Sequence, residues 1–193
     1  MDLKTALMGV HSNRTSHLSA DEKRALRQQV MVFVRDGDAA IIPQNADKLS
    51  ILCAELKMDE HAQELHDIVV DDAQPLDVRE RALSAVMRSS IGAMTVAALS
   101  AEARVALCGP WVRPMLRIGA RAPEAPATLA ALYAATPVSA RDAFVARVCA
   151  LSEAVRPIAP GALGMLISRA DPAQAAQLRA VVQSHTNTGD CKC

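Results

Sequence analysis

The sequence predicts an all-α protein, and three observations support that fold class. Apolar residues make up 51% of the chain but aromatic residues only 2%, so Ala, Leu, Val, Ile and Met supply the apolar content. Ala, Leu and Met favour helices, whereas residues that favour strands are sparse or scattered. Apolar side chains recur at helical spacing, and capping residues, Pro or Gly stand at nearly every segment boundary. Two short β-like runs, residues 30–34 and 68–70, both continue a helical pattern, so no strand is predicted.

In the first half of the chain, four helices are expected. Ser19 and Glu22 form a capping box that opens a helix over residues 20–36, and Gly37 ends that helix. The other three follow a capping residue or a proline, and they are expected after Asn45, after Asp59 and over residues 76–88.

In the second half, prolines and glycines separate six helices. The last has the clearest start, because Asp171 is an expected N-cap, Pro172 fills the first helical position and Gln174 the third. The six are expected after Ser100, over residues 111–119, over 128–135, from Ser139 to before Pro157, over 160–169, and from Asp171 to about His185.

The length of 193 residues suits one compact domain. Eight to ten helices joined by short connections are expected to form antiparallel pairs in a single helical domain over residues 19–185. Residues 1–18 are predicted to form a flexible arm, because residues 11–17 are polar, and residues 186–193 a mobile tail of small and polar residues. The longest uncharged apolar run, residues 91–101, is about half the length that a membrane span needs.

Residues 69–83 contain, in order, an acidic turn, a proline, the pair Val78-Arg79 and an Ala-Leu pair. This order resembles the turn and second helix of a HEAT repeat, and the similarity extends to about residue 87. The resemblance implies a solenoid of helix pairs that offers a long face to another macromolecule. Only one such turn is present, so an irregular helical bundle is the alternative. A period of about 40 residues, typical of helix-pair solenoids, separates the helix starts at Ser19, Asp59, Ser100 and Ser139.

The net charge is zero, but the two halves differ in sign. Residues 1–95 contain 11 Lys and Arg against 15 Asp and Glu, a net of −4, and residues 96–193 contain 10 against 6, a net of +4. Opposite halves of two copies could therefore self-associate. Every basic residue of the second half before Lys192 is Arg, which suits interface ion pairs and phosphate contacts. Five of these form the predicted partner-binding set: Arg104, Arg113, Arg117, Arg121 and Arg141.

No catalytic, cofactor-binding or metal-binding residue is predicted. His61 and His66 are five residues apart, not the four that place two zinc ligands on one helix face. Cys191 and Cys193 with His185 are one ligand short of a zinc site. The five cysteines are an odd number and three lie in apolar helical segments, which indicates reduced thiols.

Acidic residues cluster at turns of the first half. Paired carboxylates can carry out acid–base chemistry where one is desolvated. These clusters lie beside Gly37 and Pro75, where aspartates cap helices and stay solvated. Capping and solubility are therefore predicted for Asp36, Asp38, Asp71, Asp72 and Asp77.

These observations predict a non-enzymatic regulator or adaptor in the cytoplasm that binds another protein and no membrane. The Ala- and Arg-rich composition is typical of GC-rich bacteria, and the N-terminal arm has the general character of type III secretion leaders. Export by a bacterial secretion system and a chaperone-like or anti-sigma-like role are further expectations. One alternative is a nucleic-acid-binding HEAT-like repeat protein that uses the Arg-rich half. The other is an enzyme with no recognisable motif, which predicts a deep polar pocket with perturbed ionisable groups.

Overall fold

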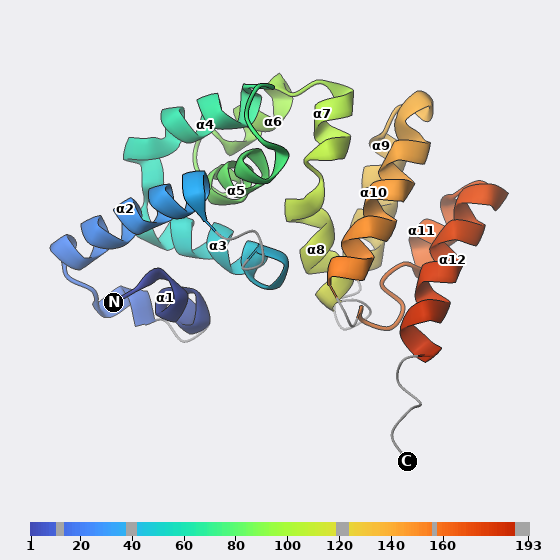
Figure 1. Ribbon diagram of the computed structural model, residues 1–193, viewed down its shortest axis with the longest axis horizontal. Helices are drawn as coiled ribbons and strands as arrows, with labels where there is room; N and C mark the ends of the chain where they lie inside the picture. The colour runs from blue at the N-terminus through green and yellow to red at the C-terminus, as the bar shows by residue number, and fades with distance from the viewer. Residues whose placement is uncertain (11–13, 38–41, 119–123, 156–157, 188–193) are drawn as a thin grey trace, which may run out of the picture. The chain divides into compact units, whose positions relative to one another are not determined.

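The computed structural model describes residues 1–10, 14–37, 42–118, 124–155 and 158–187. The protein is all-α, as predicted, and these ranges contain no strand. Its helices, numbered α1 to α12 (Figure 1), are shorter and more numerous than the eight to ten expected. Within the same ranges, no helix combines the length and apolar character required to cross a bilayer.

The chain divides into two compact units, Met1–Leu99 (unit 1) and Ser100–Cys193 (unit 2). A single helical domain was predicted over residues 19–185. That prediction rested on total length, but a unit of about 100 residues is large enough to bury a small core of its own. Each unit does so here, and the core residues of unit 2 form one cluster within that unit.

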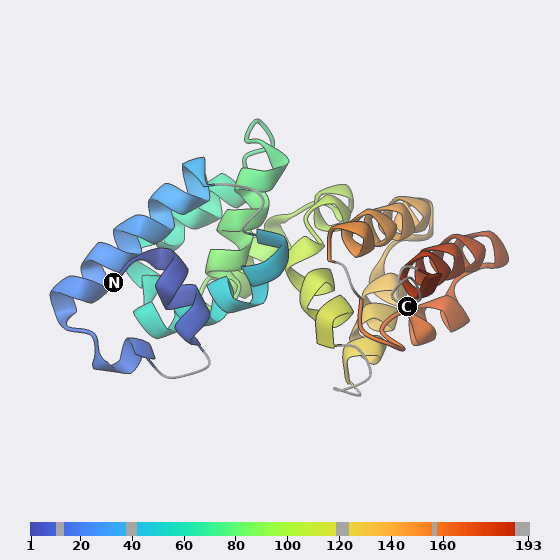
Figure 2. The same ribbon diagram turned by 60° about the horizontal axis from the view of Figure 1, so that its bottom comes forward.

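Unit 1 is arranged around one central helix, α5 (Leu76–Val86). This helix packs against α2, α3, α4 and α6 (Figures 1 and 2). Every residue from Val78 to Val86 is buried. The surrounding elements of unit 1 are α1 (Leu3–Gly9), η2 (Arg14–His17), α2 (Ala20–Asp36), α3 (Ile42–Leu56), η4 (Met58–His61), α4 (Ala62–Val70) and α6 (Gly92–Ala98).

Three arginines close the C-terminal ends of helices in unit 1. The last carbonyl groups of a helix have no partner within the helix, so a donor from elsewhere must satisfy them. Two of the three arginines lie on the central helix α5. Their hydrogen bonds connect this helix to the C-terminal ends of α4 and α2. Each donates from Nε to a carbonyl in the last turn of a helix: Arg27 to Leu56 at 2.8 Å, Arg79 to Val69 at 2.9 Å, and Arg81 to Val34 at 2.9 Å.

Residues 69–83, on which the predicted HEAT resemblance rests, form the end of α4, a turn and most of α5. Val78 is buried near the start of α5, and the buried Arg79 pairs with Asp72 of the turn at 2.7 Å. Arg79 of α5 therefore connects this helix both to the turn and to the end of α4. The HEAT-like solenoid and the irregular helical bundle both stay predictions.

The N-terminal segment, predicted as a flexible arm over residues 1–18, contains a helix. Helix α1 lies there, capped by Asp2, whose carboxylate accepts from the Thr5 amide at 2.8 Å. The Leu3 amide donates to the Gln29 side chain of α2 at 2.8 Å. Ala6, Leu7 and Val10 bury apolar surface, so α1 packs against α2 and α3. The prediction rested on the polar run over residues 11–17, of which residues 11–13 lie outside the described residues.

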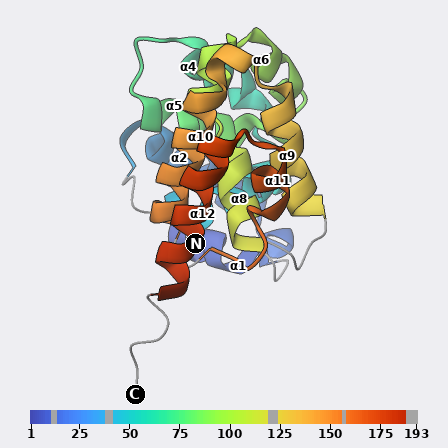
Figure 3. The ribbon, with the colours of Figure 1, turned by 90° about the vertical axis from the view of Figure 1, so that its right-hand side faces the viewer.

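Unit 2 packs its helices around Phe144 and Val148 of α10. Helix α10 contacts α7, α8 and α12, and α11 contacts α9 and α12. Figure 3 shows α10 and α12 running side by side. The elements of unit 2 are α7 (Ala101–Ala106), α8 (Gly109–Ile118), α9 (Glu124–Ala135), η6 (Val138–Ala140), α10 (Arg141–Ala154), α11 (Gly164–Arg169) and α12 (Pro172–Asn187).

Several helix boundaries differ from the expected ones. Helices α3 and α9 begin earlier, because Pro43 and Pro126 fall in their first turns, where proline is tolerated. Helix α11 begins later, because Gly161 takes a positive φ of 75° in the turn before it. Ser139 does not cap α10, since it lies inside the short 3-10 turn η6. The tail predicted over residues 186–193 is described only at 186 and 187, which end α12.

Candidate partner-binding sites

The structure separates the five arginines predicted to bind a partner. Arg104 and Arg117 are exposed, Arg141 is half-buried, and Arg113 is buried with 7% of its surface exposed. Arg121 lies outside the described residues. Arg113 and Arg117 were expected to act from one helix face, but Arg113 belongs to the buried side of α8. This set therefore does not form one exposed surface.

Arg141 contributes to a polar cavity of about 440 Å³ in unit 2. Its guanidinium lies 4.9 Å from the centre of the Tyr133 ring, and its Nε donates to the Thr136 carbonyl at 3.3 Å. The cation–π contact and the hydrogen bond hold this arginine at the start of α10. We name this space the arginine cavity; its wall also includes Val138, Asp142, Arg169, Ala170, Asp171 and Gln174.

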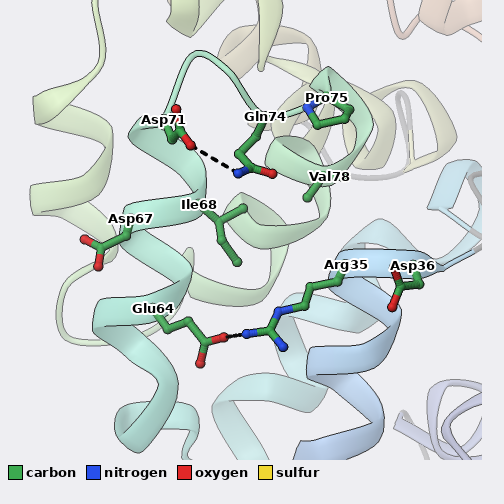
Figure 4. Close-up of a pocket in the computed structure, with 9 residues that line it drawn as sticks. All are labelled: Arg35, Asp36, Glu64, Asp67, Ile68, Asp71, Gln74, Pro75 and Val78. Carbon is green, nitrogen blue, oxygen red and sulfur yellow. Dashed lines mark hydrogen bonds and ion pairs between the residues drawn. The ribbon is translucent and has the colours of Figure 1, made fainter.

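A larger groove of about 680 Å³ lies in unit 1, between α2, α4 and the start of α5. Apolar side chains line part of it, and charged side chains line the rest (Figure 4). The sequence analysis did not predict this site, because its residues lie on three helices and the turn between two of them, and no single segment contains the pattern. We name it the acidic groove; it is lined by Arg35, Asp36, Glu64, Asp67, Ile68, Asp71, Gln74, Pro75 and Val78.

The charged groups of the acidic groove differ in their partners. Arg35 reaches from α2 to Glu64 of α4 and forms an ion pair with it (Figure 4). Asp67 lies at the rim, with its carboxylate turned away from that pair, and it accepts a hydrogen bond from the Gln63 amide at 2.8 Å. Asp36 is exposed. Among the described residues, neither Asp36 nor Asp67 forms an ion pair with a cationic side chain.

Local structure fixes the end of the groove at Asp71. The Asp71 carboxylate accepts from the Ala73 amide at 3.0 Å and from the Gln74 side chain at 3.1 Å (Figure 4). Hydrogen bonds from Ala73 and then Gln74 lower the pKa of Asp71, because they stabilise the ionised form. This carboxylate therefore stays charged at neutral pH, and the turn holds it in place before Pro75 and α5.

A tight contact ends helix α2 at the other side of the groove. The Gly37 amide donates to the Phe33 carbonyl at 2.9 Å. A Cβ atom on Gly37 would lie 2.3 Å from both the Phe33 ring and the Phe33 carbonyl oxygen, so only glycine fits there without a shift. The prediction that Gly37 ends this helix is confirmed, and the close approach places Asp36 at the groove.

Other side chains considered for chemistry have structural partners. His66 Nδ1 lies 2.9 Å from the Thr95 hydroxyl, and His61 lies near Glu60 and Glu64. In the part of the chain that the structure describes, no group of three metal-ligating side chains is close enough to share an ion. Burial raises the pKa of the Cys53 thiol to about 12, so it remains protonated and unreactive at neutral pH. Cys191 and Cys193 lie outside the described residues.

One sequence signal could have drawn attention to the acidic groove. Negative charge is unfavourable at a helix C-terminus, where the backbone dipole favours cations. Asp36 is the last residue of α2, Asp67 lies in the last turn of α4, and Asp71 follows it. Asp36 and Asp71 were predicted to cap helices, but aspartate caps helices at their N-termini and both residues lie at C-terminal ends.

Comparison with known protein families, with curated proteins and with solved structures gave no match to this chain.

Proposed function

We propose that this protein is a non-enzymatic adaptor or regulator and that its acidic groove binds a basic segment of a protein partner. The observation that carries the proposal is the charge of the groove. Four carboxylates and one guanidinium line it, a formal net of −3, and its wall also contains Ile68, Pro75 and Val78. A lysine- or arginine-bearing segment matches both features, because its charged heads suit the carboxylates and its alkyl stems suit the apolar wall.

Charge and apolar burial make comparable contributions to such binding. An exposed ion pair contributes about 0.2–1 kcal/mol, and each buried CH₂ about 0.8 kcal/mol. The groove volume of about 680 Å³ is in the range of ligand pockets and admits side chains rather than a whole folded domain. The expected partner is therefore an extended or helical segment that inserts one or two basic side chains.

The acidic groove disfavours the nucleic-acid alternative at this site. Phosphate groups would meet Asp36, Glu64, Asp67 and Asp71, and the resulting repulsion opposes binding. The Arg-rich half offers fewer exposed contacts than expected, because Arg113 is buried. A protein partner with a basic segment is the function that these side chains support best.

Fluorescence anisotropy with a labelled short peptide of arginine and leucine tests the proposal. We expect binding that weakens as salt is raised, because exposed charges are screened over about 8 Å at physiological ionic strength. The matched probe carries citrulline, which is uncharged and similar in shape, in place of each arginine, and it should bind more weakly. Equal binding of the two probes would overturn the proposal.

Variants of the groove should change the affinity in opposite directions. The double variant Asp36→Asn/Asp67→Asn removes two charges that hold no cation, so binding should weaken about three- to tenfold. Arg35→Gln releases Glu64 for the partner and should tighten binding, since the groove then carries one more uncompensated charge. The control Asp21→Asn/Asp59→Asn removes the same charge from exposed positions outside the groove.

The control variant should bind like the unmodified protein. If the groove and control variants weaken binding equally, only overall charge matters and the groove is not the site. A fluorescent oligonucleotide provides a further comparison. Tighter binding of the oligonucleotide than of the peptide, insensitive to the groove variants, would support the nucleic-acid alternative instead.

A further inference from the structure

The arginine cavity of unit 2 is built where five elements begin or end. Tyr133 comes from α9 and Val138 from η6, while Arg141 and Asp142 open α10. Arg169 ends α11, and Gln174 lies in the first turn of α12. Six polar or charged side chains therefore line about 440 Å³ of space, and none of them lines the acidic groove.

Both carboxylates of the cavity already accept hydrogen bonds from the fold. Asp142 Oδ1 accepts from the Gln174 side chain at 2.7 Å. Asp171 Oδ1 caps α12 and accepts from the Ala173 and Gln174 amides at 3.0 and 2.9 Å. The buried Tyr133 hydroxyl donates to Gln174 Oε1 at 2.7 Å. This network fixes the polar wall in one arrangement.

In contrast to the carboxylates, the guanidinium groups of Arg141 and Arg169 keep N–H donors that can bind a ligand. Arg141 uses its Nε for the Thr136 carbonyl, and its plane contacts Tyr133. Neither Arg141 nor Arg169 forms an ion pair with any residue that the structure describes. The planar fork of an arginine matches the two oxygens of a carboxylate, and two forks on one cavity suit an anion.

We propose that this cavity binds an α-carboxylate with a neighbouring N–H group, as found in a free amino acid or at the C-terminus of a peptide. Arg141 and Arg169 hold the carboxylate. The second oxygens of Asp142 and Asp171 accept the N–H group, and Tyr133, Val138 and Ala170 contact the apolar part. A phosphate dianion fits less well, because Asp142 and Asp171 add negative charge to the same cavity.

Titration calorimetry with N-acetyl-leucine and its amide tests the proposal. The amide keeps the size and the N–H group but lacks the charge, so it should bind at least about tenfold more weakly. Inorganic phosphate should also bind more weakly than N-acetyl-leucine. Equal binding of acid and amide, tighter binding of phosphate, or no binding of N-acetyl-leucine at its solubility limit would each overturn the proposal.

Two variants place the ligand in this cavity. Arg169 is exposed and holds no described partner, so Arg169→Gln should leave the fold intact and weaken N-acetyl-leucine binding about tenfold. Arg141→Lys keeps the charge but loses the fork, and it should also weaken binding. Arg179→Gln removes an exposed arginine outside the cavity and should bind normally. Unchanged binding by Arg169→Gln would contradict the proposal.

Two further probes distinguish the sources of the carboxylate. Tighter binding of free leucine than of N-acetyl-leucine would identify free amino acids as the ligand class. Tighter binding of a dipeptide that ends in leucine would identify peptide C-termini. Both results retain the proposed chemistry, and neither depends on the acidic groove, so the two proposals can fail separately.

Discussion

Several exposed carboxylates in this protein are held by hydrogen bonds from their own segment. Glu22 accepts from the Ser19 amide and hydroxyl, both at 2.9 Å. Asp2 accepts from Thr5 in the same manner at the start of α1. These donors lower the pKa of both carboxyl groups, the Ser19 amide being the largest cause for Glu22 and the Thr5 amide for Asp2. Each group serves as a reporter of whether its helix start is formed.

The lowered pKa of Glu22 should depend on its capping partner. Carbon-detected NMR titration should show that Ser19→Ala raises the pKa of Glu22 part of the way to its ordinary value, because the hydroxyl donor is lost and the amide donor remains. The pKa of Asp2 should stay low in the same variant. A Glu22 pKa that does not move would contradict the capping box.

The sign of the pH dependence follows from the direction of these shifts. A carboxyl with a lower pKa in the folded state binds its proton less tightly there than in the unfolded chain. Its contribution to stability is therefore present above its ordinary pKa and is lost as the pH falls through the folded value. Acid should loosen the starts of α1 and α2 together with the turn at Asp71, whose pKa is also lowered.

The packing of the central helix α5 depends on arginines that are buried, which is unusual for a charged side chain. Arg81 is only 2% exposed, yet it donates to the Val34 carbonyl and pairs with Asp77 at 2.9 Å. It also lies over the Phe33 ring at 5.9 Å from the ring centre. A buried charge persists only where such partners replace water. The contacts of Arg81 therefore join α5 to the end of α2.

Replacing Arg81 should destabilise unit 1 strongly. Arg81→Met keeps similar bulk but leaves the Val34 carbonyl without its donor, so the free energy of unfolding should fall by about 2–4 kcal/mol. Urea denaturation followed by circular dichroism measures this change. The matched variant Arg24→Met alters an exposed arginine of α2 and should change stability by less than about 0.5 kcal/mol. Equal effects of the two variants would contradict the capping role of Arg81.

Local signals predicted helix starts and stops well where the chain itself supplies the partner. The Ser19 capping box, the stop at Gly37 and the Asp171 cap are all confirmed. The caps supplied by Arg79 and Arg81 were not predictable, because their carbonyl partners belong to other helices. The same reason explains the acidic groove: Asp36 and Asp71 were identified as acidic clusters, but no local pattern indicates that two helices bring them to one groove.

At the scale of the whole chain, each unit has its own buried core. Leu26, Leu65 and Leu83 are at most 1% exposed in unit 1, and Leu129 and Leu178 have no exposed surface in unit 2. Composition could not predict this division, because both halves have similar helical patterns. The change of net charge near the middle of the chain is the sequence feature that coincides with it.

The two units should fold as separate fragments. Residues 1–99 and 100–193, expressed individually, should each show a helical circular dichroism spectrum and a cooperative thermal transition, because each contains a buried core. Fragments are compared with the full chain at equal molar concentration. A fragment that is unfolded alone but folds on addition of the other would show that the two cores depend on each other.

The two proposed sites belong to different units and favour opposite charges. The acidic groove in unit 1 favours cationic side chains, and the arginine cavity in unit 2 favours a carboxylate. An adaptor with both sites could bind two segments of one partner, or one segment from each of two partners. Binding at one site should be observable without the other, since the fragments carry one site each.

A ¹H–¹⁵N NMR titration of the full chain with the arginine–leucine peptide tests most directly whether the acidic groove is the partner-binding site. We expect the largest shift changes at the amides of Asp36, Glu64, Ile68, Asp71 and Gln74, with those of unit 2 almost unchanged. The changes should shrink in Asp36→Asn/Asp67→Asn and saturate at lower peptide concentration in Arg35→Gln. Changes confined to unit 2, or spread evenly over both units, would contradict the acidic groove as the partner-binding site.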